Sequence, residues 1–277
     1  MARKLLSACG IVFLSLFCLL SCGLEAFYYI EFIHDEYVAM SDVTRASIRL
    51  PSRESEGNGY SPPSDYFDNF IIFYRIYISG DNPVGTILTS DLRNTINPTL
   101  NSDFNGILST TDKTSTSVNT SNLETFFFNR RYYQLTLEDA DIASVLSRDS
   151  LSTNSQLRTI EIIFSPIAGD RPLLTLNLNG SPYAEYVLQR ANSGPGTEFR
   201  PEPENRYFLN HADLYDSAKA TNEINADVAS RSAANPPSRY TYVSMYIAAA
   251  GKSYDMPPRN IYSQPTFIGV FMLPESF

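Results

Sequence analysis

The chain has 277 residues, with 21 Lys and Arg against 30 Asp and Glu, and a net charge of −9. This length suits one large domain or two small ones. An acidic protein has no electrostatic attraction to nucleic acid, so we expect no nucleic-acid partner. There is no Trp, but the 18 Tyr and 17 Phe pack well on half-buried sheets, which favours a mainly β fold.

Residues 1–21 predict a secretion signal. Arg3 and Lys4 form a positively charged start, and the 16 residues 5–20 are uncharged and almost wholly apolar, as in signal peptides. A helix of that length would cover about 24 Å, short of the roughly 30 Å hydrocarbon core of a bilayer. A permanent spanning helix is therefore the weaker interpretation.

The end of the apolar run resembles the lipobox of bacterial lipoproteins. Leu19, Ser21 and Cys22 match that box. Leu20 stands where the commonest boxes have a small residue, and the looser boxes of spirochaete lipoproteins tolerate it. The resemblance implies a diacylglycerol thioether on Cys22, cleavage between Ser21 and Cys22, and acylation of the new amino group. The alternative is an ordinary secretion signal that is cut near Ser21.

The lipoprotein interpretation implies a mature domain, residues 22–277, held to a membrane of the bacterial cell envelope without spanning it, because two or three acyl chains anchor stably. Gly23 follows the cysteine. An Asp there retains lipoproteins at the inner membrane in some bacteria, so its absence favours the outer membrane or the cell surface.

The cysteines predict a mature domain that holds together without disulfides. Cys9 and Cys18 would leave with the signal, and Cys22 would be acylated. No thiolate nucleophile and no thiolate metal site would then remain. The 256 residues left carry 19 Lys and Arg against 30 Asp and Glu, a net charge of −11.

Aromatic, β-branched and alternating apolar patterns predict strands at residues 27–33, 44–50, 67–79, 157–164, 173–178, 183–189, 240–249 and 266–273. The run 67–79 is the strongest, and it is apolar on both faces. A strand of that kind is expected to be central and covered on both sides. Residues 125–128 and 132–137 predict a hairpin across 129–131.

Capping residues predict short helices in the middle of the chain. Ser90 can cap one helix, and Asn97 followed by Pro98 begins a second that closes near Gly106. Thr136 with Asp139 resembles a capping box before a third. Residues 211–234 have a weak helical pattern, and 52–65, 109–121 and 193–203 are predicted loops.

Four segments resemble the strand signatures of fibronectin type III-like sandwiches: residues 46–51, 69–75, 237–251 and 263–265. The chain departs at Leu50, where that family usually has Trp. The resemblance implies an antiparallel β-sandwich (fibronectin type III/Ig-like) with a large mixed insertion that contains a few short helices. It covers residues 27–80 and 236–273. The stretch 81–235 is either an inserted subdomain or an elaboration of the sandwich. The resemblance implies a binding or spacer module.

The familiar catalytic, cofactor and metal patterns are rejected, so we assign no catalytic, cofactor-binding or metal-ligating residue. The residues 251–253, Gly-Lys-Ser, resemble the end of a phosphate-binding loop. Such a loop needs a glycine at position 246, where this chain has Tyr246, and the prolines at 257 and 258 oppose the helix that should follow. His34 and His211 would matter only if they met in space. The carboxylates at 138, 139 and 141 lack the rest of a calcium loop and fit a helix start better.

Tyr60, Tyr66, Tyr254 and Tyr262 flank predicted turns. Exposed tyrosines make good contact surfaces, so these four are the candidate binding surface for a peptide or a glycan. The alternative is that they pack at the edges of the core.

The sequence favours a lipid-anchored envelope protein that binds a peptide, a glycan or another envelope protein without catalysis and without a cofactor. One alternative is a structural or assembly lipoprotein that packs against envelope proteins. A second is a hydrolase of envelope polymers, which would require two carboxylates, or a histidine and an aspartate, to converge in a cleft.

Overall fold

The computed structural model describes residues 30, 33–50, 67–79, 90–109, 123–147, 150, 158–164, 170–178, 181–191, 206–208, 227–230, 240–252, 257–258 and 260–273. The predicted secretion signal and Cys22 lie outside these residues. Within them, no helix has both the length and the apolar character needed to cross a bilayer.

The described strands form two six-stranded sheets. Sheet A has the order β1 (Val38–Asp42), β2 (Arg45–Leu50), β6 (Arg158–Ile163), β7 (Leu173–Leu178), β8 (Ser181–Gln189) and β5 (Thr136–Leu137). Sheet B has the order β11 (Asn260–Tyr262), β10 (Tyr240–Lys252), β3 (Phe67–Ser79) and β4 (Tyr133–Gln134), while β12 (Thr266–Leu273) pairs with β10 and β9 (Val228–Ser230) pairs with β3. Neighbouring strands are antiparallel except β3 and β9, which are parallel.

The helices described are short. They are the 3₁₀ turn η1 (Asp35–Tyr37) and helices α2 (Ser90–Ile96), α3 (Pro98–Ser109), α4 (Leu123–Phe128) and α5 (Ile142–Val145). The predicted class, mainly β with antiparallel sheets and a few short helices, is confirmed.

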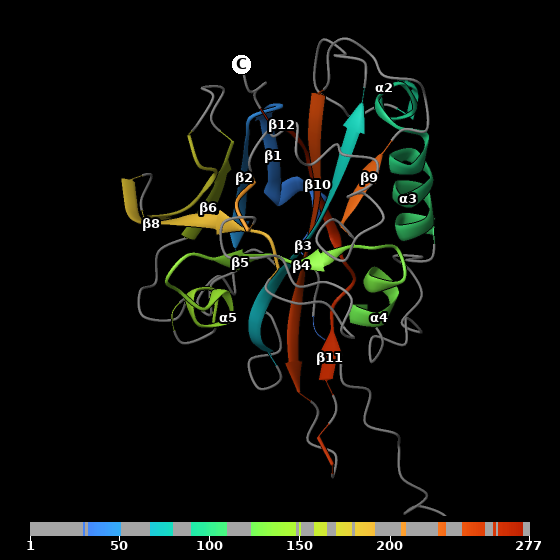
Figure 1. The fold of residues 1–277 in the computed structure, drawn as a ribbon. Helices are drawn as coiled ribbons and strands as arrows, with labels where there is room; N and C mark the ends of the chain where they lie inside the picture. The colour runs from blue at the N-terminus through green and yellow to red at the C-terminus, as the bar shows by residue number, and fades with distance from the viewer. Residues whose placement is uncertain are drawn as a thin grey trace, which may run out of the picture.

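Sheet B is the middle layer of the molecule. One apolar cluster joins it to sheet A and contains the inward side chains of both sheets, and a second cluster joins its other face to α2, α3 and α4. Figure 1 shows α2, α3 and α4 on one side of β3 and β10, and β6 and β8 on the other. The two sheets therefore pack as a β-sandwich-like pair, with helices over the free face of sheet B.

Strand β3 is buried on both faces, as its sequence predicts. Its bounds are those predicted, and its alternate residues enter the two clusters: Ile72 and Tyr74 face sheet A, whereas Phe73 and Tyr77 face the helices. The rings of Phe73 and Phe127 of α4 stack with centroids 4.2 Å apart. Complete burial of such a side chain is worth roughly 1.5–3 kcal/mol, so β3 holds the layers together.

The middle of the chain is built into both sheets. Strand β6 pairs with β2 along its whole length, and β7 and β8 continue sheet A from there. Strands β4 and β9 pair with β3 in sheet B. The described strands of the stretch 81–235 are thus continuous with the two sheets.

The hairpin predicted over 125–137 is wrong in its first half. Residues Leu123–Phe128 form helix α4, and Arg131, with φ 57°, closes the turn before β4. Tertiary packing overrides the β propensity of the three phenylalanines, because a helix puts Phe127 into the cluster under sheet B.

Several boundaries also differ from prediction. Helix α3 continues past Gly106 to Ser109. Residues Val228–Ser230, within the weak helical pattern of 211–234, form strand β9 because they pair with β3. Strand β11 was not predicted. Of the strand expected at 27–33, the described residues Ile30 and Ile33 are buried in the core and outside any strand. The predicted loops at 52–65 and 193–203 lie outside the described residues.

Candidate functional site

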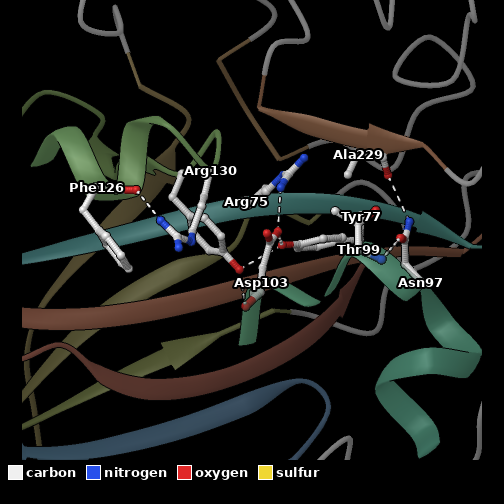
Figure 2. A network of polar contacts seen from close by, with 10 residues as sticks. Arg75, Tyr77, Asn97, Thr99, Asp103, Phe126, Arg130 and Ala229 are labelled. Carbon is white, nitrogen blue, oxygen red and sulfur yellow. Dashed lines mark hydrogen bonds and ion pairs between the residues drawn. The ribbon is translucent and has the colours of Figure 1, made fainter. Parts of the chain in front are cut away.

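A polar network lies between sheet B and helix α3, centred on Arg75 of β3. Arg75 is buried, and a buried charge needs a partner. Arg75 Nη1 donates to Asp103 Oδ2 of α3 at 2.5 Å, and the Tyr77 hydroxyl donates to the same oxygen at 2.6 Å. Figure 2 shows the three side chains meeting between the strand and the helix. These contacts join α3 to the centre of β3.

Tyrosines continue the network towards β10. The Tyr132 hydroxyl lies 2.9 Å from the Tyr77 hydroxyl and 3.2 Å from Ser244 Oγ. Burial raises the pKa of Tyr77, of Tyr132 and of Tyr246, so these groups stay protonated at neutral pH. The Tyr246 ring packs against Tyr132, and its buried hydroxyl has no hydrogen-bond partner among the residues that the structure describes.

Asn97 fixes the start of α3 in the same region. Its Oδ1 accepts a hydrogen bond from the Thr99 amide at 2.9 Å, which caps the helix. Its Nδ2 donates to the Ile78 and Ala229 carbonyls at 3.4 Å, and Figure 2 shows the contact with Ala229. The predicted helix start at Asn97 and Pro98 is confirmed. Asn97 therefore joins α3, β3 and β9.

Two further arginines of the helical layer lie over aromatic rings. The Arg93 guanidinium lies 3.6 Å from the Phe104 ring centroid, and that of Arg130 lies 3.9 Å from the Phe126 centroid. Arg130 also donates to the Phe126 carbonyl, as Figure 2 shows. Such cation–π contacts stabilise packing. In this network the Asp103 carboxylate is paired with Arg75, and the groups connect the helical layer to sheet B.

A second network is buried between the two sheets. Arg190, which immediately follows β8, forms a bidentate ion pair with Asp227, which immediately precedes β9, and both side chains are almost completely buried. The Tyr74 hydroxyl donates to Asp227 Oδ2 at 2.8 Å and accepts from the Ala191 amide at 2.9 Å. Burial raises the pKa of Tyr74, and the Asp227 carboxylate adds to the effect. This network ties β8 to β3.

Two more carboxylates are engaged near the surface. Glu138 accepts hydrogen bonds from the Tyr207 hydroxyl and from Arg171, and these contacts lower the pKa of Glu138. Glu124 of α4 accepts from the Tyr262 hydroxyl at 2.6 Å and from Gln134 Nε2 at 3.1 Å. Both carboxylates link segments that are far apart in the sequence.

Of the four candidate tyrosines, the structure describes Tyr262. It is buried, at 6% exposure, and hydrogen-bonded to Glu124, so it packs at the core edge as in the alternative interpretation. Tyr60, Tyr66 and Tyr254 lie outside the described residues, as do Ser21 and Cys22.

The other residues weighed from the sequence have structural roles where they are described. The ring centroids of His34 and Tyr37 lie 6.0 Å apart, and position 211 is outside the described residues. Asp141 caps α5, in place of the predicted box at Thr136 and Asp139, because its Oδ1 accepts from the Ala143 amide. Among the residues placed by the structure, no group of three or more His, Cys, Asp or Glu could hold a metal ion.

Sequence reasoning missed Arg75, Asp103, Arg190 and Asp227. One signal was available: Arg75 is a charged residue near the middle of a strand expected to be buried on both faces, and such a residue requires a counter-charge. Its partner could not be named, because Asp103 comes from a helix 28 residues away.

No protein-family model, curated protein or solved structure gave a match to this chain. The fibronectin type III resemblance therefore stays a prediction from sequence patterns.

Proposed function

We propose that this chain is a lipid-anchored protein of the bacterial cell envelope whose β domain binds a partner without catalysing a reaction. The observation that carries the anchor is the sequence at Leu19, Ser21 and Cys22, at the end of a positively charged and then apolar leader. Acylation at Cys22 would fix the domain beside a membrane, with the outer membrane or cell surface favoured.

The start of the folded body is consistent with a short tether. Ile30 and Ile33 are buried in the core between the sheets, and the Thr266 hydroxyl donates to the Ile33 carbonyl. Ile30 is eight residues after Cys22, and eight extended residues span at most about 29 Å. An acyl chain on Cys22 would therefore hold Ile30 within about 29 Å of the anchor.

The engagement of the four carboxylates in the networks described above supports binding over catalysis at these groups. Asp103 and Asp227 are paired with arginines, Glu138 is paired with Arg171, and Glu124 accepts from a tyrosine and a glutamine. A catalytic acid or base must instead be free to exchange a proton with its substrate. These four groups are used to connect strands and helices.

The anchor is tested by expressing the full chain in a bacterial host and labelling the cells with an alkyne analogue of palmitate. We expect label in the membrane fraction for the wild type. The matched control is Cys18→Ser, which removes a leader cysteine outside the box and should keep the label. Cys22→Ser should lose the label and the processed form. The anchor is refuted if wild type carries no label or if Cys22→Ser is labelled equally.

A further inference from the structure

The outer face of sheet A, defined as the face turned away from sheet B, carries an arrangement of polar groups that the networks above do not use. Strand β7 sets the two faces: Leu174 and Leu176 enter the core between the sheets. Because successive side chains of a strand alternate, Thr175 and Asn177 lie on the outer face.

A row of polar residues crosses this face through Thr175. Glu161 of β6 and Glu185 of β8 are the cross-strand partners of Thr175, one on each side. Partners in antiparallel strands have Cα atoms about 4.5–5.5 Å apart, so the two glutamates are about 10 Å apart along the row. The ion pairs recorded among the described residues, on Asp103, Asp227 and Glu138, involve neither glutamate.

An exposed aromatic ring adjoins this row. The β7–β8 pairing shifts at Asn177, where Pro182 is the partner and Tyr183 is the extra residue. Counting back by alternation from Glu185 puts Tyr183 on the outer face. Tyr183 is 68% exposed. Among the residues that the structure describes, it is the large hydrophobic side chain that lies open to solvent.

The buried polar atoms of β7 point to a ligand. Thr175 is 2% exposed and Asn177 is 8% exposed, yet Thr175 Oγ1 and Asn177 Oδ1 have no hydrogen-bond partner among the described residues. An unpaired buried hydroxyl or amide oxygen is destabilising and uncommon in native proteins. Two of them lie at alternate positions of one central strand, beside two carboxylates and an exposed ring. They are explained if hydroxyl donors from a ligand complete their hydrogen bonds once the groups that cover these oxygens move aside.

We propose that the outer face of sheet A binds a neutral oligosaccharide, with Glu161, Glu185, Thr175 and Asn177 accepting hydrogen bonds from sugar hydroxyls and Tyr183 stacking on a sugar ring. A sugar supplies many O–H donors and an apolar ring face, which are what carboxylates, an amide oxygen and a tyrosine ring accept. The proposal rests on the binding role proposed above and names the ligand class.

The chemistry of the face favours a sugar over other ligands. Beside Thr175 the charged groups are the two glutamates, which disfavour an acidic peptide or a nucleic acid there; Arg45 and Arg49 of β2 lie on the same face, beyond β6. A basic peptide would pair with both glutamates but would make little use of the neutral groups Thr175, Asn177 and Tyr183. A neutral sugar also predicts weak salt dependence, because salt screens attraction between charges and leaves hydrogen bonds to uncharged hydroxyls largely unaffected.

The experiment is calorimetric titration of the full chain with cellohexaose, maltohexaose and chitohexaose, in a polyoxyethylene detergent that carries no sugar headgroup. We expect at least one of the three to bind. Tyr183→Ala should weaken binding about tenfold, and Glu185→Gln about three- to tenfold, as expected for loss of a ring contact or a hydrogen bond to a charged group. The charge-matched control is Glu36→Gln, an exposed residue in η1, which should leave affinity unchanged.

Thr175→Val separates a binding role from a structural one. Removing an unpaired buried hydroxyl while keeping the shape should leave the melting temperature equal or higher, yet it should weaken sugar binding about threefold or more. A structural role predicts the reverse, with a lower melting temperature and unchanged affinity.

Three results would overturn the proposal. These are no heat from any of the three hexasaccharides at millimolar concentration, equal affinity of wild type and Tyr183→Ala, or an affinity that falls more than about fivefold between 50 and 500 mM NaCl. The last would indicate a charged ligand such as a basic peptide. The titration in detergent does not depend on acylation, so its failure would leave the membrane anchor untouched, and failure of the anchor would leave the sugar site untouched.

Discussion

Neutralising Asp227 should destabilise the protein strongly. Asp227→Asn keeps the side-chain shape and the oxygen that accepts from Tyr74, but it leaves the Arg190 guanidinium charged, 1% exposed and without its counter-charge. Removing one partner of a buried ion pair costs about 3–5 kcal/mol. For a domain of this size about 1 kcal/mol shifts the melting temperature by about 2–4 °C, so we expect a fall of roughly 6–20 °C.

The assay is thermal unfolding followed by circular dichroism, with urea unfolding of the same variants to obtain free energies. Arg190→Met should be destabilising on its own. The double variant should be more stable than Asp227→Asn alone, because it leaves no unpaired charge in the core. A loss below about 1 kcal/mol for Asp227→Asn, or purely additive effects in the double variant, would refute the assignment of a desolvated, coupled pair.

Three other substitutions test local features. Gly106→Ala should stabilise α3 by up to about 1 kcal/mol, measured by urea unfolding, because the added Cβ would make ordinary contact with Arg130 at 3.5 Å; a loss of stability would contradict this packing. Gly269→Ala should lower the melting temperature, because Gly269 has φ 156° and an added Cβ would overlap the Met40 sulfur. The double variant with Met40→Ala should recover part of that loss. A double variant with no recovery would argue against the contact between the two residues. Glu138→Gln should be less stable than wild type at pH 6, and the difference should shrink towards pH 3. The pKa of Glu138 in the folded protein is lowered from 4.5. The ionised carboxylate therefore stabilises the fold above pH 4.5, and this stabilisation is lost as pH falls through the folded pKa. A constant difference across that range would contradict the role of the ionised carboxylate.

Elements whose pattern comes from local burial were predictable from the sequence. Strands β3 and β12 were predicted with their observed bounds. A long run of residues that is apolar on both faces is buried most completely as a strand covered on both sides. The alternating apolar residues of β2 are also buried as expected, with Ala46, Ile48 and Leu50 in the core. Helix α3 was signalled by Asn97 and Pro98, whose capping chemistry is local.

Features that depend on distant contacts were not predictable. The phenylalanines before residue 129 have β propensity, whereas the packing of Leu123 and Phe127 into the cluster beside sheet B favours a helix. The short strand β9 is defined by its pairing with β3, about 150 residues earlier in the chain. The polar networks need the same kind of information, since Arg190 and Asp227 meet only once both sheets are assembled.

The outer face of sheet A shows the same limit. Glu161, Thr175 and Glu185 come from three predicted strands, but nothing in the sequence gives the register that aligns them. A one-residue slip would turn every side chain of a strand to the other face. The row therefore became visible only from the pairing of β6, β7 and β8.

The measurement that tests the account most directly is the intact mass of the native protein, followed by sequencing of its N-terminal peptide. The account predicts a chain that begins at residue 22, with a diacylglyceryl group on the cysteine sulfur. A free thiol at Cys22, or a chain that still carries residues 1–21, would contradict it.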